Sequence, residues 1–352
     1  ATHEYWQRDT QLQGKRPFVL SRSTFAGAGK WTSHWLGDNW SKWEYLQYSV
    51  AGLMDFSMFG IPLVGADVCG FHSPFEDEMC GRWTQLSAFY PFARNHFNFS
   101  DEGKSLPRQE PFRLNAPWNA TARSAIIQRY SYLRYMYTKL YEINKNGGTL
   151  IKPLFFQFQE DENTYQGYEH SFLVGSSLKV TPVLIPKTEH KGKINSYFPV
   201  GSRFISLNDF STIIEGGDKG KNITLDASLD YINVHLNEGS IFPFQNMTED
   251  HYELRTQGLL DNHGITLLIF VDRNGYAEGT LFINRDENTK GDYQYYNFRF
   301  NNQTLSIDQL AGQQYSEEQG NQILEKIVVL NSENLTKVSL SACAFDQNSD
   351  PR

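Results

Sequence analysis

The chain has 352 residues, and its 39% hydrophobic, 14% aromatic and 20% charged residues are typical of a globular protein and exclude a disordered one. Because 32 lysines and arginines stand against 40 aspartates and glutamates, the net charge of -8 disfavours a phosphate-binding surface and hence nucleic acid as a partner. The length indicates two or three domains, and no apolar run approaches the roughly 18 residues of a membrane span.

About the first 170 residues alternate apolar strands with amphipathic helices. The predicted strands are residues 16–21, 60–66 and 150–156, and the predicted helices are about residues 41–59, 76–92 and 121–144. Ser41 and Glu44 form a predicted capping box for the first helix. Buried strands separated by helices predict a parallel sheet. Part of an α/β barrel is favoured over a doubly wound sheet, because no Gly-x-Gly-x-x-Gly follows a strand.

After about residue 172 the pattern changes to short strands bounded by Asn, Asp and Gly. One set comprises residues 177–185, 193–199, 222–226 and 231–236, and a second comprises residues 265–271, 295–300 and 325–330. Two β-sandwich modules separated by the polar segment 244–251 are the simplest interpretation. We therefore expect three parts: residues 1–172 from an α/β barrel, residues 173–250 as a proximal β-sandwich, and residues 251–352 as a distal one.

The three cysteines and the Asn-x-Ser/Thr sequons bear on the compartment. Cys69 and Cys80 flank a short loop that a disulfide could close in an oxidising compartment, and two independent buried thiols are the alternative. Metal binding is the weakest interpretation, because His72 is the only nearby nitrogen ligand. Asn39 is excluded as a glycan site because it lies inside a motif described below. Candidate glycosylation sites are Asn98, Asn119, Asn222, Asn246, Asn302 and Asn334. Together they favour a secreted or endomembrane protein.

Functional residues of an α/β barrel follow the carboxyl ends of its strands, and here those positions are rich in polar and aromatic side chains. They include Arg22, the segment 34–40, Asp67, Phe71 and the segment 94–96. These positions bring together two aspartates, two arginines, two histidines and several aromatic rings, a combination that suits a neutral polyhydroxylated ligand such as a sugar. A pocket of this kind could hydrolyse a glycosidic bond with a pair of carboxylates. The alternative is that Arg22 and Asp67 form a structural ion pair and the tryptophans belong to the core.

Four segments in order, Arg16–Gly27, His34–Ser41, Gly60–Phe71 and Arg82–His96, resemble glycoside hydrolase family 31. They are most similar to the branch of lysosomal acid α-glucosidases and intestinal maltases and sucrases. The similarity continues more weakly to about residue 236 and fades beyond about residue 250. The resemblance implies a retaining exo-acting α-glucosidase that removes terminal α-1,4-linked glucose from maltose, malto-oligosaccharides or glycogen. It also implies a TIM barrel followed by two β-sandwiches and no cofactor or metal.

The site residues implied by the resemblance are carried over position by position. Asp38 matches the general acid/base, which protonates the departing oxygen and later deprotonates the attacking water. The positions matching substrate-binding residues are Arg22, Trp35, Asp67, Phe71 and His96. Among them, Arg22 and His96 would bind sugar hydroxyls, Asp67 would orient its neighbours at the base of the pocket, and the two aromatic side chains would form apolar walls.

The cysteines also match the family. Cys69 and Cys80 correspond to a loop disulfide of the lysosomal and brush-border branch, whereas the endoplasmic-reticulum glucosidase II branch usually has no cysteine at the first position. The resemblance therefore implies a lysosomal or secreted protein.

The sequence departs from the family at the nucleophile, which lies in a Trp-x-Asp-Met-Asn-Glu segment that these 352 residues do not contain. Asp55 is no substitute, because it falls inside a predicted helix. We expect the chain to be the carboxy-terminal portion of the enzyme, to pair with the amino-terminal part of the same enzyme, and to be inactive by itself. The alternatives are an α-xylosidase or another family 31 α-glycosidase, and, in a different class, a non-catalytic carbohydrate-binding protein.

Overall fold

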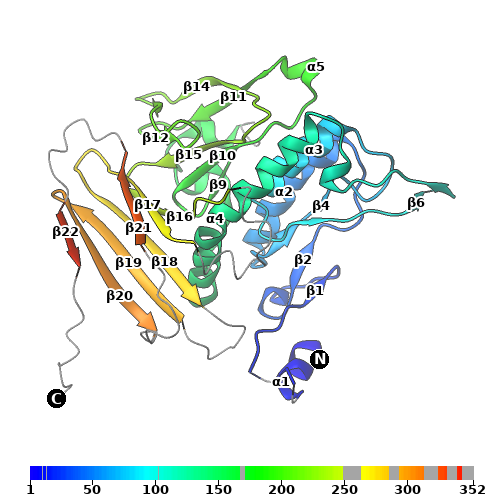
Figure 1. Cartoon of the computed structure of the whole chain (residues 1–352), viewed down its shortest axis with the longest axis horizontal. Coiled ribbons are helices and arrows are strands. Elements are labelled where there is room, and N and C mark those ends of the chain that lie inside the picture. The colour runs from blue at the N-terminus through cyan, green and yellow to red at the C-terminus, as the bar shows by residue number, and fades with distance from the viewer. Residues whose placement is uncertain are drawn as a thin grey trace.

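The computed structural model describes residues 1–9, 11–12, 14–101, 103–166, 171–248, 263–284, 293–312, 324–330 and 339–342. Three parts lie next to one another: an α/β part in blue and cyan, a green β part, and a yellow-to-red β part (Figure 1). The long helix α4 (Trp118–Asn146) lies among all three. The chain therefore passes once through each part, in the order that the sequence pattern predicts.

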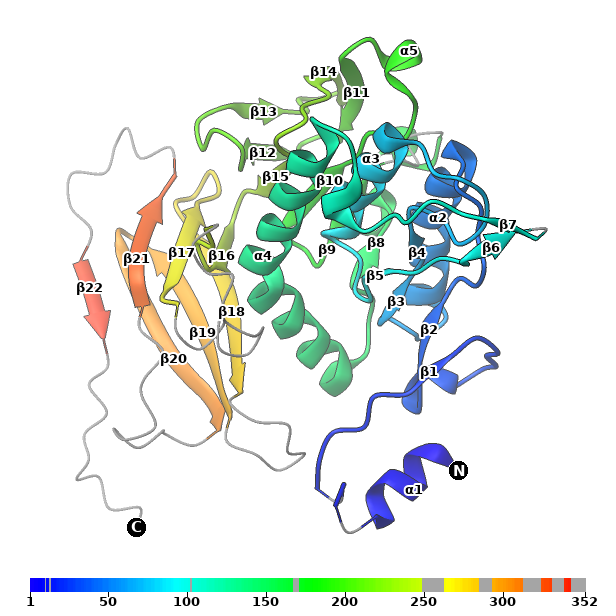
Figure 2. The same cartoon turned by 45° about the vertical axis from the view of Figure 1, so that its right-hand side comes forward.

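The α/β part contains short parallel strands in chain order. The first three, β1 (Leu20–Ser21), β2 (Ser33–Trp35) and β3 (Val64–Gly65), form one parallel sheet. One residue later, β4 (Asp67–Val68) pairs in parallel with β5 (Arg94–Asn95). Residues 64–68 therefore connect the three-stranded sheet directly to the pair of β4 and β5, as Figure 2 shows. This sequential parallel order confirms that strands and helices alternate in this part, as predicted for a piece of an α/β barrel.

Two helices connect these strands. In α2 (Trp43–Met58) the buried side chains Leu46, Val50, Leu53 and Met54 recur at helical spacing and face the core. The following connection carries α3 (Asp77–Ser87), which packs against α4. The predicted continuation to residue 92 is wrong, because the chain leaves α3 through turns before Pro91. A two-stranded hairpin, β6 (Ser100–Asp101) with β7 (Lys104–Ser105), precedes α4 and projects from the body of the chain (Figure 1).

The predicted capping box at the start of α2 is also wrong. Lys42 is the N-cap residue, and no side chain caps the helix. Ser41 instead donates its hydroxyl to the carbonyl of Cys69 at 2.7 Å, so a tertiary contact takes the group that would have capped the helix. Glu44 lies in the first turn, where its charge favours the positive end of the helix dipole.

The remaining helices are short. They are α1 (Thr2–Arg8), α5 (Lys187–His190) and the 3-10 turns Ala28–Lys30, Pro111–Arg113, Leu154–Phe156 and Glu162–Tyr165.

The middle part is an antiparallel sheet faced by a second, smaller one. Its six strands run in the spatial order β13-β12-β15-β10-β9-β8, and β11 and β14 form a separate two-stranded sheet. Their bounds are β8 (Ile151–Lys152), β9 (Phe172–Val174), β10 (Leu178–Thr181), β11 (Lys193–Phe198), β12 (Arg203–Ser206), β13 (Ile213–Glu215), β14 (Lys221–Asp226) and β15 (Asn233–Asn237). The segment 150–156 was predicted to close the parallel series, but its described pairing is antiparallel to β9.

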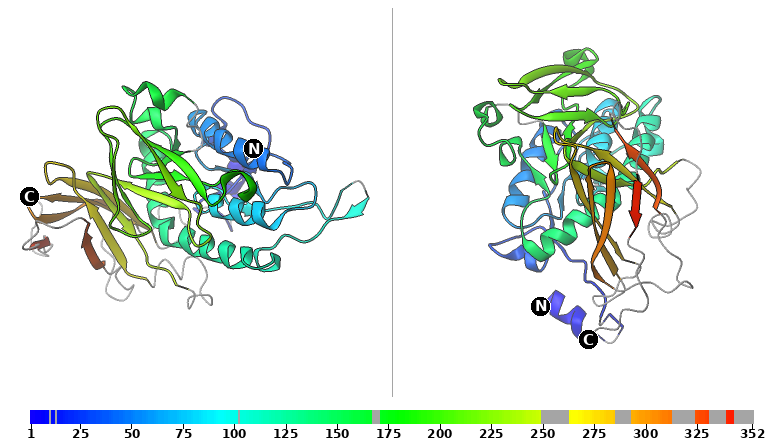
Figure 3. Two further views of the ribbon diagram at one scale, coloured as in Figure 1. Left: turned by 90° about the horizontal axis from the view of Figure 1, so that it is seen from above. Right: turned by 90° about the vertical axis from the view of Figure 1, so that its left-hand side faces the viewer.

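The last part is a curved seven-stranded sheet in the order β21-β17-β16-β18-β19-β20-β22. Figure 3 shows it from two further sides. Its strands are β16 (Ser240–Phe244), β17 (Ile265–Phe270), β18 (Ala277–Asn284), β19 (Tyr293–Asn301), β20 (Thr304–Gly312), β21 (Leu324–Val329) and β22 (Ser339–Ala342). The predicted all-β character of both carboxy-terminal parts is confirmed, and the predicted domain limits stay predictions.

A lysine is buried between the two sheets of the middle part. Lys179 is fully buried and donates to Thr181 at 3.0 Å and Ser196 at 2.5 Å, while its ammonium lies 4.3 Å from the ring centre of Phe198. Burial lowers the pKa of Lys179 to about 7. Directly opposite on β15, His235 is also buried, and burial together with the charge of Lys179 lowers its pKa to about 3. Burial therefore shifts the titration of both groups toward the neutral form, and Lys179 is still charged below about pH 7.

His235 predicts an acid-sensitive stability. Unfolding restores its ordinary pKa of 6.5, so the unfolded chain binds a proton that the folded chain excludes, and stability falls as the pH drops from 6.5 toward 3. We expect this group to remove about 3 kcal/mol of unfolding free energy between about pH 7 and pH 4. Urea unfolding across this range should show a shallower pH slope for His235→Gln.

A second variant, Lys179→Met, should change the slope between about pH 7 and pH 10.5, where the lysine pKa differs between the two states. It should also weaken the slope below pH 6.5, because the lysine charge contributes to the lowered pKa of His235. Identical slopes below pH 6.5 for the parent chain and His235→Gln would contradict the prediction.

Candidate active site

The loops after β1 and β2 meet in an ion pair. Arg22 Nη1 lies 3.6 Å from Asp38 Oδ2, and both side chains are open to solvent. Between them, Gly37 has a φ of +83°, and a Cβ there would come within 3.2 Å of Arg22 Nε. Glycine is thus required both by the backbone conformation and by the close approach of the guanidinium. The arrangement holds the Asp38 carboxylate beside a cation while leaving it accessible.

A second ion pair joins the buried Asp67 to the partly exposed Arg94. The side chain of Asp67 is fully buried, and its Oδ1 accepts a hydrogen bond from Arg94 Nη2 at 2.7 Å. The two residues are register partners on β4 and β5. Burial raises the pKa of Asp67, and the charge of Asp38 adds to the increase, while Arg94 and His96 oppose it. The charges of Asp38 and His96 both act on the Asp67 carboxylate, so the predicted site residues Asp38, Asp67 and His96 lie close to one another.

Asn39 ties the Asp38 loop to the Asp67 loop. Its side chain is buried, donates to the Asp67 carbonyl at 3.0 Å and accepts from the Phe71 backbone N–H at 2.9 Å. Its own carbonyl accepts from the N–H groups of Phe71 and His72. Because both ends of the amide are engaged inside the fold, Asn39 cannot carry a glycan in this structure, as the sequence analysis expected.

Aromatic side chains border the polar group. The guanidinium of Arg94 lies 5.2 Å from the ring centre of Trp35, and Phe71 lies 5.0 Å from the ring of His96. Trp40 is partly exposed beside His72 at 5.1 Å. Rings next to charged groups offer apolar faces for the C–H side of a sugar and polar atoms for its hydroxyls.

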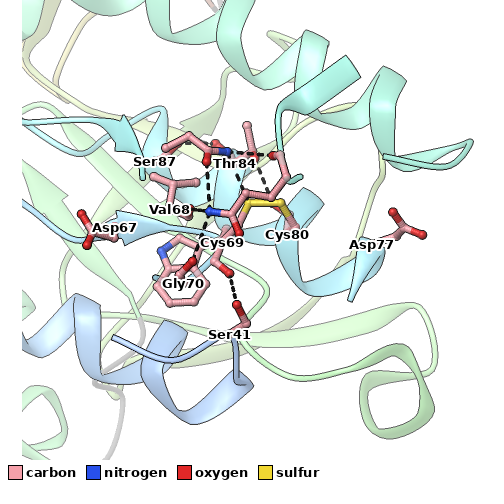
Figure 4. Close-up of a disulfide and its surroundings, with 12 residues drawn as sticks. Ser41, Asp67, Val68, Cys69, Gly70, Asp77, Cys80, Thr84 and Ser87 are labelled. Carbon is pink, nitrogen blue, oxygen red and sulfur yellow. Dashed lines mark hydrogen bonds between the residues drawn. A yellow bond between two sulfur atoms is a disulfide. The ribbon is translucent and has the colours of Figure 1, made fainter. Parts of the chain in front are cut away.

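A disulfide joins Cys69 to Cys80 and fixes the loop after β4 to the start of α3 (Figure 4). The carbonyl of Cys69 accepts from Ser41, and the carbonyl of Cys80 accepts from Thr84 at 2.8 Å. The loop after β2 is thereby attached to the disulfide loop as well. Cys69 has a φ of +72°, a left-handed conformation that the surrounding contacts hold in place.

Several predicted partners differ in the structure. The alternative ion pair of Arg22 with Asp67 is wrong, because Arg22 faces Asp38 and Asp67 is held by Arg94. His34, counted among the two histidines of the site, is buried against Phe56 with ring centres 3.9 Å apart. Burial lowers the pKa of His34, and its Nδ1 lies 2.9 Å from the Ser21 carbonyl oxygen. His34 is thus a core residue.

Arg94 and Asn39 lie in the segments 94–96 and 34–40 that the sequence predicted to border the site, but their contacts with Asp67 were not predicted. A signal for the pairing of Arg94 with Asp67 was available, because Arg94 opens the segment that follows the helix after Asp67 and precedes His96 by two positions. For Asn39 the sequence offered only its place beside Asp38. Within the described ranges, no group of three His, Cys, Asp or Glu side chains could hold a metal ion. In that same part of the chain, no helix has the length and apolar character to cross a bilayer.

The glycosylation candidates differ in accessibility. Asn222, Asn246 and Asn302 are exposed, and Asn98 and Asn119 are half-buried. Asn334 lies outside the described residues, as does Cys343.

Two family models match the chain. The family 31 glycosyl hydrolase TIM-barrel domain matches residues 1–139, and the family 31 C-terminal domain matches residues 147–242. Lysosomal alpha-glucosidase of Rattus norvegicus is 38% identical over 315 residues, which cover 84% of this chain and 31% of that protein. Alpha-xylosidase 1 of Arabidopsis thaliana is 38% identical over 279 residues, covering 78% of this chain and 28% of that protein.

Solved structures of family 31 enzymes also resemble this chain. A crystal structure of the glucosidase II alpha subunit with α3-Glc2 bound is 28% identical with a TM-score of 0.76, covering 86% of this chain and 32% of that one. The chain thus spans about a third of the length of the curated relatives it matches.

The ion pair of the buried Asp67 with Arg94 predicts a large and specific loss of stability. Arg94→Met leaves the fully buried Asp67 carboxylate without its cation, so we expect the unfolding free energy to fall by about 3 to 5 kcal/mol. The double variant Arg94→Met/Asp67→Asn removes the buried charge and should recover most of that loss. Urea unfolding of the three proteins measures both effects.

The control is Arg113→Met, whose partner Glu110 is at the surface and whose loss should stay below about 1 kcal/mol. An Arg94→Met variant as stable as the parent, or a double variant no better than the single one, would contradict this account of the pair.

Proposed function

Because the chain belongs to glycoside hydrolase family 31, we propose that it supplies the general acid/base half of a retaining α-glucosidase site. The substrates proposed are maltose, malto-oligosaccharides or glycogen, from which terminal α-1,4-linked glucose is released. The observation that carries this proposal is the Asp38 carboxylate, which is accessible, lies 3.6 Å from Arg22 and is linked by Asn39 to the buried pair of Asp67 and Arg94. Such a carboxylate is both held in place and free to reach a ligand.

Asp38 would act twice in the reaction. In its protonated form it donates to the glycosidic oxygen as the bond to the leaving sugar breaks. As a carboxylate it then takes a proton from the water that hydrolyses the glycosyl-enzyme. Arg22, whose guanidinium lies against Gly37, limits the positions that the carboxylate can adopt and offers further N–H groups to sugar hydroxyls.

The other predicted residues would bind the sugar that is cleaved. His96 is exposed beside Phe71 and can bond a hydroxyl, while the Phe71 ring covers an apolar face. Asp67 has one buried oxygen, Oδ2, without a hydrogen-bond partner among the described residues. Because this carboxylate is closed to solvent and held by Arg94, we propose that Asp67 orients its neighbours at the base of the pocket.

A retaining mechanism also needs a carboxylate nucleophile. Asp67 is ill suited to attack a sugar, because it is fully buried and paired with Arg94. We propose that the nucleophile comes from the amino-terminal part of the same enzyme, in the family segment that residues 1–352 lack. Protonation, deprotonation and nucleophilic attack by carboxylates supply the whole reaction, so the proposal needs no cofactor.

The alternatives keep the same site. An α-xylosidase remains a candidate, because Alpha-xylosidase 1 of Arabidopsis thaliana is as similar in identity as the rat α-glucosidase. A non-catalytic carbohydrate-binding protein would retain Arg22, His96 and the aromatic walls but lack a nucleophile. Comparing turnover of 4-nitrophenyl α-glucoside and α-xyloside by the full-length protein separates these three cases.

For localisation we propose the lysosome or the cell exterior. The rat relative is named a lysosomal enzyme, and the disulfide between Cys69 and Cys80 requires an oxidising environment to form.

Substitution of Asp38 in the full-length protein tests its role. For Asp38→Ala we expect kcat/KM on maltose to fall by about 10² to 10⁴, because the leaving sugar is no longer protonated. On 4-nitrophenyl α-glucoside the loss in the first step should be much smaller, since nitrophenolate leaves without a proton. Added azide should restore turnover, because an anionic nucleophile needs no general base.

The control is Asp55→Ala, an exposed position on α2, which should match the parent on both substrates. Equal losses on maltose and on the nitrophenyl glucoside, with no response to azide, would contradict the acid/base assignment.

The 352 residues expressed alone should be inactive. They lack the proposed nucleophile, so purified protein of this length should hydrolyse neither maltose nor 4-nitrophenyl α-glucoside above the rate of a blank. Circular dichroism showing folded protein would confirm that the sample is native. Enzymatic turnover by this chain would overturn the assignment of the nucleophile to the amino-terminal part.

A further inference from the structure

A groove that contains none of the candidate active-site residues lies between the 3-10 turn Pro111–Arg113 and the first turns of α4. It has a volume of about 600 Å³ and is lined by Pro111, Phe112 and residues of α4 that include Asn119 and Ile126. Phe112 is 75% exposed and Ile126 is 37% exposed, which is unusual for neighbouring large apolar side chains. The guanidinium of Arg113 lies 5.6 Å from the Phe112 ring centre.

Asn119 brings a modification signal into the lining of this groove. It is the asparagine of the sequon Asn119-Ala120-Thr121. Its Oδ1 accepts a hydrogen bond from the Ala120 N–H at 2.7 Å, whereas its Nδ2 makes none among the described residues. Nδ2 is the atom to which an N-linked glycan is attached. The amide is thus oriented by its oxygen, with the nitrogen available beside an exposed aromatic ring.

We propose that Asn119 carries an N-linked glycan whose first sugar lies in this groove and covers Phe112. A pyranose presents C–H groups on one face and hydroxyls around its rim, so it can pack on an aromatic ring and keep its polar atoms in water. The groove offers that combination, with Pro111, Phe112 and Ile126 as apolar surface beside the attachment point. This inference rests on the proposed passage through the endomembrane lumen, and it goes beyond the proposed glucosidase function.

The attachment chemistry uses a lipid-linked oligosaccharide pyrophosphate as donor. The Asn119 Nδ2 forms a bond to C1 of the first sugar while the bond from C1 to the pyrophosphate oxygen breaks. Nδ2 loses one proton, and the lipid pyrophosphate leaves with the electron pair. Thr121 is buried in the folded chain and its hydroxyl donates to the Pro117 carbonyl at 3.3 Å, so transfer must precede the folding of this turn.

Asn302 provides a comparison within the same molecule. It lies in the exposed turn between β19 and β20 with a φ of +48°. Trypsin releases each of the two sequons alone, Asn119 in residues 114–123 and Asn302 in residues 300–326. Their occupancy and their accessibility to a glycosidase can therefore be measured separately in one digest.

The experiment uses full-length protein secreted or purified from a eukaryotic cell. Native glycoprotein is exposed to peptide N-glycosidase for increasing times, and the conversion of each asparagine to aspartate is followed by mass spectrometry of the two peptides. Because an aromatic contact of ordinary strength slows access, we expect release at Asn119 to be about threefold to tenfold slower than at Asn302. Phe112→Ala should abolish the difference, and Phe99→Ala, an exposed aromatic residue elsewhere, should preserve it.

The outcomes separate the claims. Slow release that Phe112→Ala restores supports the inference. An unmodified peptide 114–123 beside a modified peptide 300–326 overturns it and leaves the proposed compartment intact. Occupied Asn119 with release equal to Asn302, or slow release that survives Phe112→Ala, overturns the packing of the sugar in the groove. If no sequon is occupied in protein from its natural source, the proposed compartment fails together with this inference.

Discussion

The ion pair between the buried Asp67 and the partly exposed Arg94 is the interaction on which the candidate site depends. It joins β4 to β5, and its cost of desolvation is offset only while both partners are in place. Asn39 attaches the loop of Asp38 to the backbone of Asp67, and the disulfide holds the residues that follow. The accessible Asp38 is therefore positioned through contacts that are themselves buried, which suits a group that must hold its geometry while meeting a ligand.

Helix α4 has the corresponding role for the whole chain. Tyr132 and Tyr135 meet Phe242 of β16 edge-on at 5.1 and 4.9 Å, and Tyr141 stacks on Phe282 of β18 at 3.9 Å. The hydroxyl of Tyr135 also donates to the Val174 carbonyl on β9. Helix α4 packs against strands of both β parts and against α3. The three parts of the chain therefore share one continuous hydrophobic core, which includes residues of the barrel strands.

The sequence was most informative where the pattern is local. Apolar runs located the strands, and spacing such as Leu46, Val50 and Leu53 located the buried face of α2. It failed where a side chain had two possible partners: Ser41 could have capped α2 but bonds the Cys69 carbonyl, and the strand Ile151–Lys152 pairs with β9. For the site, the motif segments were identified, but the contacts of Arg94 and Asn39 with Asp67 were not predicted, because Asp67 lies 27 and 28 positions away from them.

The sequence by itself determined the family, the order of the parts and the residues available for chemistry, because these are properties of motifs and of local hydrophobic patterns. Only the tertiary structure decided which charges meet. Arg22 could have paired with either aspartate, and the choice of Asp38 follows from Gly37, which lets the guanidinium approach, and from Arg94, which already neutralises Asp67. Ion pairing depends on distance and burial in three dimensions, and residue order specifies neither directly.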